Sequence, residues 1–304
     1  MDVLHGLDAL NQLPPGNALS VGNFDGVHLG HRKIIEFLKD AAEHVVVVTF
    51  EPHPVGVLRP NLAPPRLTPP GRKRELLEAA GVTHLVELPA EPSVLGLSAD
   101  DFWRTIRDQA RPEVWAEGHD FRFGKGASGN VNRLRQWADG SGVRVETVEP
   151  ATVTLPGLHV VHASSSLARW LLAHGRVADA RAVLGRPYEL AGEVVHGEKR
   201  GRTIGFPTAN VRVSDHLVPA DGVYAASATV DGMNHAVALS IGTNPTFDGP
   251  ARTVEAYLLD FDGDLYGQTL TLKLHRWLRG QVKYRGVDPL VEQLHRDVAA
   301  VRAA

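Results

Sequence analysis

Residues 22–35 read GNFDGVHLGHRKII and directly follow the apolar run Ala18–Val21. The apolar run predicts a strand that ends at a glycine, and the apolar spacing from Leu29 to Leu38 predicts the buried side of a helix. A strand, a glycine turn and a helix start bring unpaired backbone N–H groups and the positive end of a helix dipole to one point. The stretch therefore predicts an α/β fold with a phosphate-binding loop.

Two histidines make this loop more specific than a general phosphate loop. His28 and His31 stand three residues apart at the expected helix start, where both imidazoles can lie on the same side. Each ring can donate a hydrogen bond to a phosphate oxygen, and Gly30 between them leaves room for a phosphate to approach the backbone. A Rossmann-like turn with two incidental histidines is the alternative.

Length and composition narrow the class of protein. The chain has 304 residues, which favours two domains, because one core rarely grows to this size. It is 43% hydrophobic and 22% charged with a net charge of −3, so neither nucleic acid nor a polybasic membrane anchor is indicated. The lack of cysteine excludes disulfides, thiolate metal sites and cysteine nucleophiles. We find no signal-peptide pattern and no apolar run long enough to cross a bilayer, so we expect a cytoplasmic monomer or weak homo-oligomer.

The remainder of the first half alternates strands and helices. Residues 45–50 (VVVVTF) are apolar without alternation, which is typical of a strand buried on both faces of a parallel sheet. Helices are expected at 72–80, ending at Gly81, and after Ser98, with a strand at 83–88. Strand, helix and strand in this order predict right-handed crossovers and a Rossmann-like sheet.

Two segments follow strand ends, where open α/β sheets bind ligands. Residues 50–54 (FEPHP) hold Phe50 and His53 close to prolines, and alone they would suggest only a rigid loop. Residues 118–125 (GHDFRFGK) contain Phe121 and Phe123, whose aromatic faces can lie on one side against a planar ring, next to the acceptor Asp120. A charged hairpin with core phenylalanines is the alternative here.

Beyond residue 186 the pattern changes to short strands with glycine turns, which is typical of an all-β domain, after a helix expected from 169 to 184. Residues 192–211 (GEVVHGEKRGRTIGFPTANV) combine glycines with the cations Lys199 and Arg202. Thr208 and Asn210 stand two residues apart, on one side of an extended chain, and their oxygens suit Mg²⁺ and phosphate.

Residues 253–261 (TVEAYLLDF) alternate between apolar and polar positions, so that Glu255 shares a strand face with Tyr257. A lone glutamate on a strand is usually solvated. A carboxylate can also take the proton of an alcohol that attacks phosphorus. Residues 289–304 predict an amphipathic helix that packs on the β domain.

These motifs together resemble the bacterial bifunctional riboflavin kinase/FAD synthetase family. GNFDGVHLGH is similar to its nucleotidyltransferase module, FEPHP and GHDFRFGK are similar to segments near its flavin and nucleotide, and GEVVHGEKRGRTIGFPTANV is similar to its kinase module. The resemblance implies a Rossmann-like FMN adenylyltransferase domain over residues 1–185. It also implies a six-stranded β-barrel riboflavin kinase domain, with a C-terminal helix, over residues 186–304.

The resemblance further implies two reactions and their sites. ATP and riboflavin would give FMN and ADP in the second domain, with Glu255 as general base. ATP and FMN would then give FAD and pyrophosphate in the first domain, with His28, His31 and Arg169 as catalytic residues. Phosphates of ATP would be bound by Gly22, Asn23, Phe24, Asp25, Gly30, Ser164, Ser165, Ser166, Gly197, Lys199, Arg202, Thr208 and Asn210, the last two also holding Mg²⁺. Flavin would be bound by Phe50, His53, Asp120, Phe121 and Phe123.

One motif departs from the family pattern. Residues 163–169 (ASSSLAR) stand where the family carries a run close to ISSTxxR, and they differ at Ala163, Ser166 and Leu167 while keeping hydroxyls and Arg169. A riboflavin kinase with a degenerate first domain is therefore one alternative. A non-catalytic flavin carrier or regulator is another, although binding a flavin does not require the histidine pair, Thr208, Asn210 and Glu255 all at once.

Overall fold

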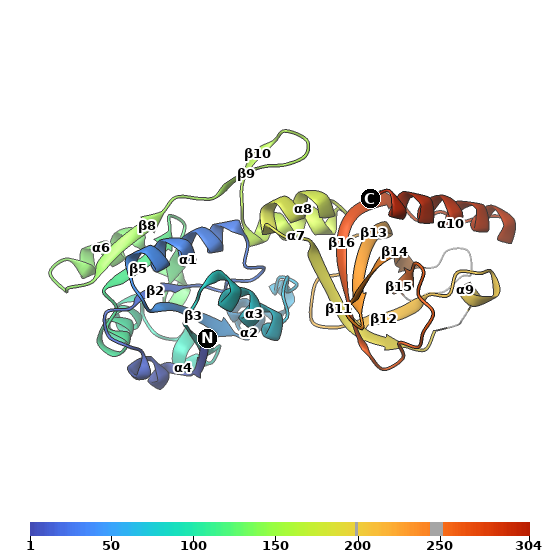
Figure 1. Ribbon diagram of the computed structural model, residues 1–304. Coiled ribbons are helices and arrows are strands. Elements are labelled where there is room, and N and C mark those ends of the chain that lie inside the picture. Colours follow the sequence, from blue (N-terminus) through green and yellow to red (C-terminus); the bar gives the residue numbers. More distant parts are fainter. Residues whose placement is uncertain (198–199, 244–251) are drawn as a thin grey trace. The chain divides into compact units, whose positions relative to one another are not determined.

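The computed structural model describes residues 1–197, 200–243 and 252–304, with the side chain of residue 200 excepted. Contacts within the chain divide it into two compact units, and Figure 1 shows the chain coloured along its sequence from blue to red. Unit 1 comprises Met1–Thr152 and His162–Ser164, and unit 2 comprises Val153–Val161 and Ser165–Ala304. The domain boundary that the sequence predicts between residues 185 and 186 stays a prediction.

Unit 1 is built on a parallel sheet of six strands in the order β1-β4-β3-β2-β5-β8. Its strands are β1 (Asp2–His5), β2 (Ala18–Val21), β3 (Val45–Glu51), β4 (His84–Pro89), β5 (Val114–Gly118) and β8 (Arg144–Val148). The chain builds outward from β2 through β3 to β4 and then returns to β5 on the other side of β2. The strand order therefore reverses at β2, and the carboxyl end of β2 is where such a sheet binds its ligand.

Helices connect these strands and cover the sheet (Figure 1). They are α1 (Leu29–Ala41), α2 (Pro54–Leu58), α3 (Pro70–Ala80), α4 (Pro92–Leu95), α5 (Ala99–Thr105) and α6 (Val131–Ala138), with a short hairpin of β6 (Arg122–Phe123) and β7 (Gly129–Asn130). The predicted helix ends are confirmed: Gly81 follows α3 in a left-handed conformation with φ 103°, and the Ser98 side chain caps α5.

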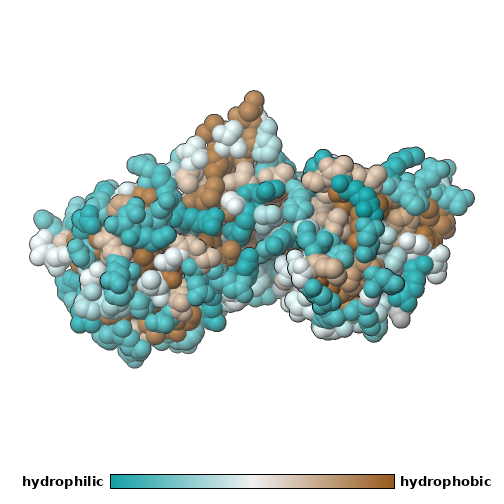
Figure 2. Space-filling model, in the orientation of Figure 1, coloured by the Kyte–Doolittle hydropathy of each residue, from teal (hydrophilic) through white to brown (hydrophobic). Residues whose placement is uncertain are grey.

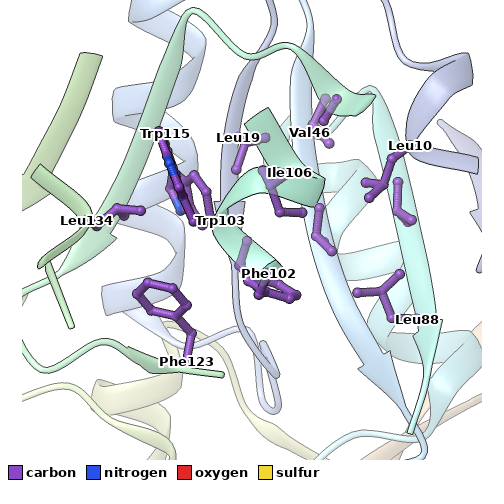
Figure 3. Packing of buried hydrophobic residues seen from close by; sticks show 14 of the residues in the cluster. Leu10, Leu19, Val46, Leu88, Phe102, Trp103, Ile106, Trp115, Phe123 and Leu134 are labelled. Carbon is purple, nitrogen blue, oxygen red and sulfur yellow. The ribbon is translucent and has the colours of Figure 1, made fainter. Parts of the chain in front are cut away.

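Two apolar clusters fill the two faces of the sheet. Val46 and Val48 of β3 belong to one cluster, together with Trp115, Phe102 and other side chains drawn in Figure 3. Val45 and Val47 belong to the other cluster, which packs under α1 and α3. The unalternating apolar run 45–48 is therefore buried on both faces, as the sequence predicts.

Unit 2 contains a closed six-stranded barrel in the order β11-β12-β15-β14-β13-β16. Its strands are β11 (Tyr188–Val195), β12 (Ala209–Val213), β13 (Gly222–Val230), β14 (Met233–Thr243), β15 (Arg252–Leu258) and β16 (Thr269–Arg279), with the short helix α9 (Arg200–Thr203) before β12. The helix α10 (Val287–Arg302) begins two residues earlier than predicted. It packs on the barrel through Val298 and Val301, and Arg279 of β16 pairs with its buried Asp297 at 2.7 Å.

The segment before the barrel corrects one expectation. The helix expected over 169–184 is two helices, α7 (Ser165–Ala173) and α8 (Val177–Leu184). Gly175 between them has a φ of 71°, a conformation that ends a helix and that glycine adopts at little cost. Ahead of α7 lies a hairpin of β9 (Thr152–Thr154) and β10 (Val160–His162), where Figure 2 shows exposed apolar residues in brown and Leu158 is 85% exposed. None of the helices described is both long enough and apolar enough to cross a membrane.

Candidate active sites

The loop between β2 and α1 has an unusual backbone. Phe24, Gly26 and Val27 have φ angles of 48°, 83° and 39°. Phenylalanine and the β-branched valine adopt positive φ only when their surroundings hold them there. The surrounding structure therefore holds the loop in one conformation at the carboxyl end of β2, where the sequence predicts the phosphate site.

His28 caps the helix that follows this loop. Its Nδ1 accepts hydrogen bonds from the backbone N–H groups of Gly30 at 3.1 Å and His31 at 3.3 Å. An acceptor Nδ1 means that the proton of the neutral ring is on Nε2, which makes Nε2 a donor. The ring of His31 stacks on that of His28 with centroids 3.7 Å apart, so the prediction that both imidazoles lie on one side is confirmed.

Gly30 is required by close contacts. A Cβ at this position would lie 2.9 Å from Cε1 of His28 and 3.1 Å from the carbonyl oxygen of Ala163. The ASSSLAR run therefore reaches the start of α1 at Ala163, and Ser164 follows within the same unit. Ser165, Ser166 and Arg169 belong to α7 in unit 2, and their contact with a triphosphate stays a prediction.

Asp25 holds the loop from within the protein. Its buried carboxylate accepts the backbone N–H groups of Leu67 at 3.0 Å and Thr68 at 3.1 Å, and the hydroxyl of Thr68 accepts the N–H of Gly26 at 3.0 Å. These hydrogen bonds fix the loop through Asp25, and the predicted role of Asp25 in binding ATP stays a prediction. Gly22, exposed Asn23 and buried Phe24 line the same loop.

The predicted flavin residues lie at the end of β3 or follow β3 and β5, the two strands that flank β2. Phe121 and Phe123 stack with centroids 5.2 Å apart and an interplanar angle of 15°, as their spacing predicts. Phe123 belongs to the core beside Trp115 (Figure 3), so Phe121 is the more accessible of the two rings. His53 caps α2 through Nδ1. The half-buried Phe50 at the end of β3 and the exposed Asp120 after β5 complete this set.

Glu117 is a buried acid that the sequence analysis missed. It is 3% exposed at the end of β5, and its carboxylate accepts the backbone N–H of Val21 and the indole N–H of Trp115, each at 2.7 Å, and the hydroxyl of Ser20 at 3.2 Å. Burial raises the pKa of Glu117 to about 8, although these three donors work in the opposite direction. Val21 directly precedes the phosphate loop, so Glu117 fixes the backbone at the point where the loop begins.

Glu117 should make the stability of unit 1 depend on pH. The folded state holds the proton more tightly than the unfolded chain, whose pKa is near 4.5. The stabilisation is therefore complete below pH 4.5 and is lost as the pH rises toward 8, by about 5 kcal/mol in total. Glu117→Gln resembles the protonated acid and should remove this dependence. We expect the free energy of unfolding in urea to be no higher for the variant than for the native protein at pH 5, and higher for the variant at pH 9. The same pH dependence in both proteins would contradict this assignment.

In unit 2 the barrel brings Glu255 next to the Thr208–Asn210 segment. Glu255 on β15 pairs with Asn210 on β12. The hydroxyl of Thr208 donates to one carboxylate oxygen of Glu255 at 3.4 Å, and that of Thr253 donates to the other at 3.0 Å. The predicted alternation along β15 is confirmed, since Val254, Ala256 and Leu258 are buried and Glu255 is half-buried. A carboxylate, a hydroxyl and a carboxamide thus meet at one place.

Gly197 contributes through its lack of a side chain. A Cβ there would collide with the carboxamide of Asn210, so this glycine lets the loop after β11 lie against the Asn210 side chain. Arg202 is exposed in α9. Lys199, the remaining predicted phosphate ligand of this segment, lies outside the described residues.

Comparison with known proteins identifies the family of the chain. Family models described as FAD synthetase and riboflavin kinase match residues 10–157 and 184–304. A bifunctional riboflavin kinase/FMN adenylyltransferase from Listeria monocytogenes is 36% identical, covering 94% of this chain and 91% of the relative. One from Pseudomonas fluorescens is 36% identical, covering 100% of this chain and 97% of the relative. The chain belongs to the bifunctional riboflavin kinase/FMN adenylyltransferase family.

A solved structure matches the whole fold. A crystal structure described as a macrolide-efflux protein from Streptococcus pneumoniae covers 99% of this chain, with a TM-score of 0.86 and 30% identity. Membership of the family means that this protein phosphorylates riboflavin to FMN and adenylylates FMN to FAD, with ATP as the co-substrate of both steps. The predicted family, fold class and pair of activities are thereby confirmed.

Proposed function

We propose that Glu255 is the general base of the riboflavin kinase reaction. The primary alcohol of riboflavin attacks the γ-phosphorus of ATP, its proton passes to the Glu255 carboxylate, and ADP leaves. The supporting observation is the pair of hydroxyl hydrogen bonds from Thr208 and Thr253, because they fix the carboxylate in one orientation. Thr253 is thus a positioning residue that the sequence analysis missed.

We further propose that Thr208 and Asn210 hold the Mg²⁺ that accompanies ATP. The donor set fits this ion, since Mg²⁺ prefers oxygen ligands and the Thr208 hydroxyl and Asn210 carboxamide lie beside the Glu255 carboxylate. When bound, Mg²⁺ would neutralise charge on the phosphates of ATP. Gly197 and the cations Lys199 and Arg202 are assigned to the same phosphates.

In unit 1 we propose that catalysis rests on position and charge rather than on a base. A phosphate monoester such as FMN is largely dianionic near neutral pH and can attack the α-phosphorus of ATP directly, while pyrophosphate leaves. The Nε2–H of His28, the ring of His31 and the positive end of the α1 dipole would stabilise the phosphate charge, and Ser164 is assigned to the same phosphates. Arg169, Ser165 and Ser166 are assigned to the triphosphate, and Phe50, His53, Asp120, Phe121 and Phe123 to the flavin.

Chromatography of the products formed from riboflavin, ATP and Mg²⁺ tests this assignment. We expect an FMN peak followed by FAD, and neither product when Mg²⁺ is removed by a chelator. FMN without FAD, also from chemically reduced flavin, would point to the degenerate first domain. Flavin binding without consumption of ATP would favour the carrier. The cytoplasmic location and the state of monomer or weak homo-oligomer stay predictions.

A further inference from the structure

Lys73 is a buried lysine in α3, a helix that carries none of the predicted site residues. It is 4% exposed, whereas the side chains of its neighbours Arg72 and Arg74 are 39% and 40% exposed. Burial of an ammonium group costs free energy unless partners compensate for the lost water. The partners of Lys73 therefore indicate what this lysine does.

These partners lie at the carboxyl end of β3. The ammonium of Lys73 donates to the hydroxyl oxygen of Thr49 at 3.4 Å and pairs with the carboxylate of Glu51 at 3.6 Å. The fully buried Thr49 hydroxyl in turn donates to the carbonyl oxygen of Asn23 at 3.2 Å. A continuous chain of hydrogen bonds thus runs from α3 to the backbone of the phosphate loop.

The loop needs such a support, because Phe24 and Val27 are held at positive φ. The Asp25 side of the loop is held by the backbone of Leu67 and Thr68, two residues ahead of α3. Asn23 on the other side is held by Thr49 and thereby by Lys73. The start of α3 and its preceding residues thus clamp the loop from two directions.

Charged groups of both signs surround the Lys73 ammonium. Burial lowers the pKa of Lys73, while the nearby carboxylates of Glu51, Glu87 and Asp25 act against this effect and Arg66 adds to it. Burial alone would raise the pKa of Glu51, but the bidentate hydrogen bonds of Arg66 and the charge of Lys73 outweigh it and lower that pKa. Two cations and Glu51 therefore form one charged group behind the loop.

We propose that Lys73 is a positioning residue for FMN adenylylation, which through the Thr49 hydroxyl holds the carbonyl of Asn23 and the strained β2–α1 loop in the conformation that receives ATP. The inference rests on the proposed adenylylation site at this loop. Misplacement of a catalytic loop by about 1 Å can lower a rate by roughly 10²-fold, so the effect on turnover should be measurable.

A double-mutant cycle on the full-length protein tests the link. Lys73→Met and Thr49→Val should each lower kcat for FAD formation from supplied FMN about tenfold or more, with a smaller change in the KM for ATP. The double variant should be no slower than the slower single variant, because both changes cut the same chain of bonds. Lys39→Met, at an exposed lysine in the last turn of α1, is the matched control and should keep native rates.

Riboflavin phosphorylation by unit 2 of the same molecules serves as the internal reference and should be unchanged. Multiplying losses in the double variant would overturn the proposal, as would a native kcat in Thr49→Val, a substitution that keeps the shape of the side chain. If Lys73→Met fails to fold, the Thr49→Val rate alone decides. If the native protein makes no FAD, the proposed function is overturned instead. Assaying the native protein beside the variants distinguishes this outcome from a failure of the Lys73 proposal.

Discussion

Replacing Glu255 by glutamine is expected to lower the rate of riboflavin phosphorylation by about 10²- to 10⁴-fold, the range that general-base catalysis contributes. The variant keeps the shape of the side chain, and its one carboxamide oxygen can still accept the Thr253 hydroxyl, while the NH2 group that replaces the other oxygen faces Thr208. This carboxamide cannot take the proton of the attacking alcohol. FAD formation from supplied FMN should continue at the native rate. Chromatography of products from riboflavin and, separately, from FMN measures both activities in one preparation.

The matched control for this variant is Glu193→Gln. Glu193 is also a glutamate on a barrel strand, but its side chain is 53% exposed and its nearest charged partner is Arg212 at 3.9 Å. The control should retain both activities. If the Glu255 variant loses the two activities together, the division of labour between the units is wrong; if it keeps the kinase activity, Glu255 is not the base.

Much of the fold follows from local patterns in the sequence. The apolar run 45–48, the glycine at 81 and the alternation around Glu255 each correspond to one periodicity or one backbone preference, and each is found where expected. The break between α7 and α8 was missed because Gly175 is a single glycine in an otherwise helical pattern. The folded structure gives a second reason for glycine that the sequence does not show, since a Cβ there would lie 3.2 Å from Trp277 and 3.3 Å from Tyr224.

The support of the site was less predictable than the site itself. Lys73 stands among Arg72 and Arg74, and nothing in that run of cations distinguishes the buried one; only the folded α3 turns it toward Thr49. Glu117 had a usable signal, because it lies two residues after Trp115 on the same face of an apolar strand. An acid on such a face must find donors, and the ends of β2 and β5 supply them.

Replacing both His28 and His31 by alanine is expected to yield a protein that makes FMN and stops there, with FAD formation reduced at least about 10²-fold. The structure shows that alanine at His28 also removes a helix cap worth about 1 kcal/mol, because Nδ1 accepts the N–H groups of Gly30 and His31. A second double variant, His28→Asn with His31→Asn, separates the two effects. Asparagine is a favourable capping residue, but it lacks the Nε2–H donor.

Both double variants should therefore lose FAD formation, while the asparagine variant retains more of the thermal stability of unit 1. His44→Asn is the control, since His44 directly precedes β3 and so lies at the amino ends of the strands, away from the phosphate loop at the carboxyl end of β2. Its riboflavin kinase and adenylylation rates should be native. Normal FAD output from the asparagine variant would mean that His28 serves as a cap alone, and the stabilisation of the phosphate charge would then come from the dipole of α1. Loss of FAD formation in the stably capped asparagine variant would instead assign the stabilisation of the phosphate charge to the imidazoles.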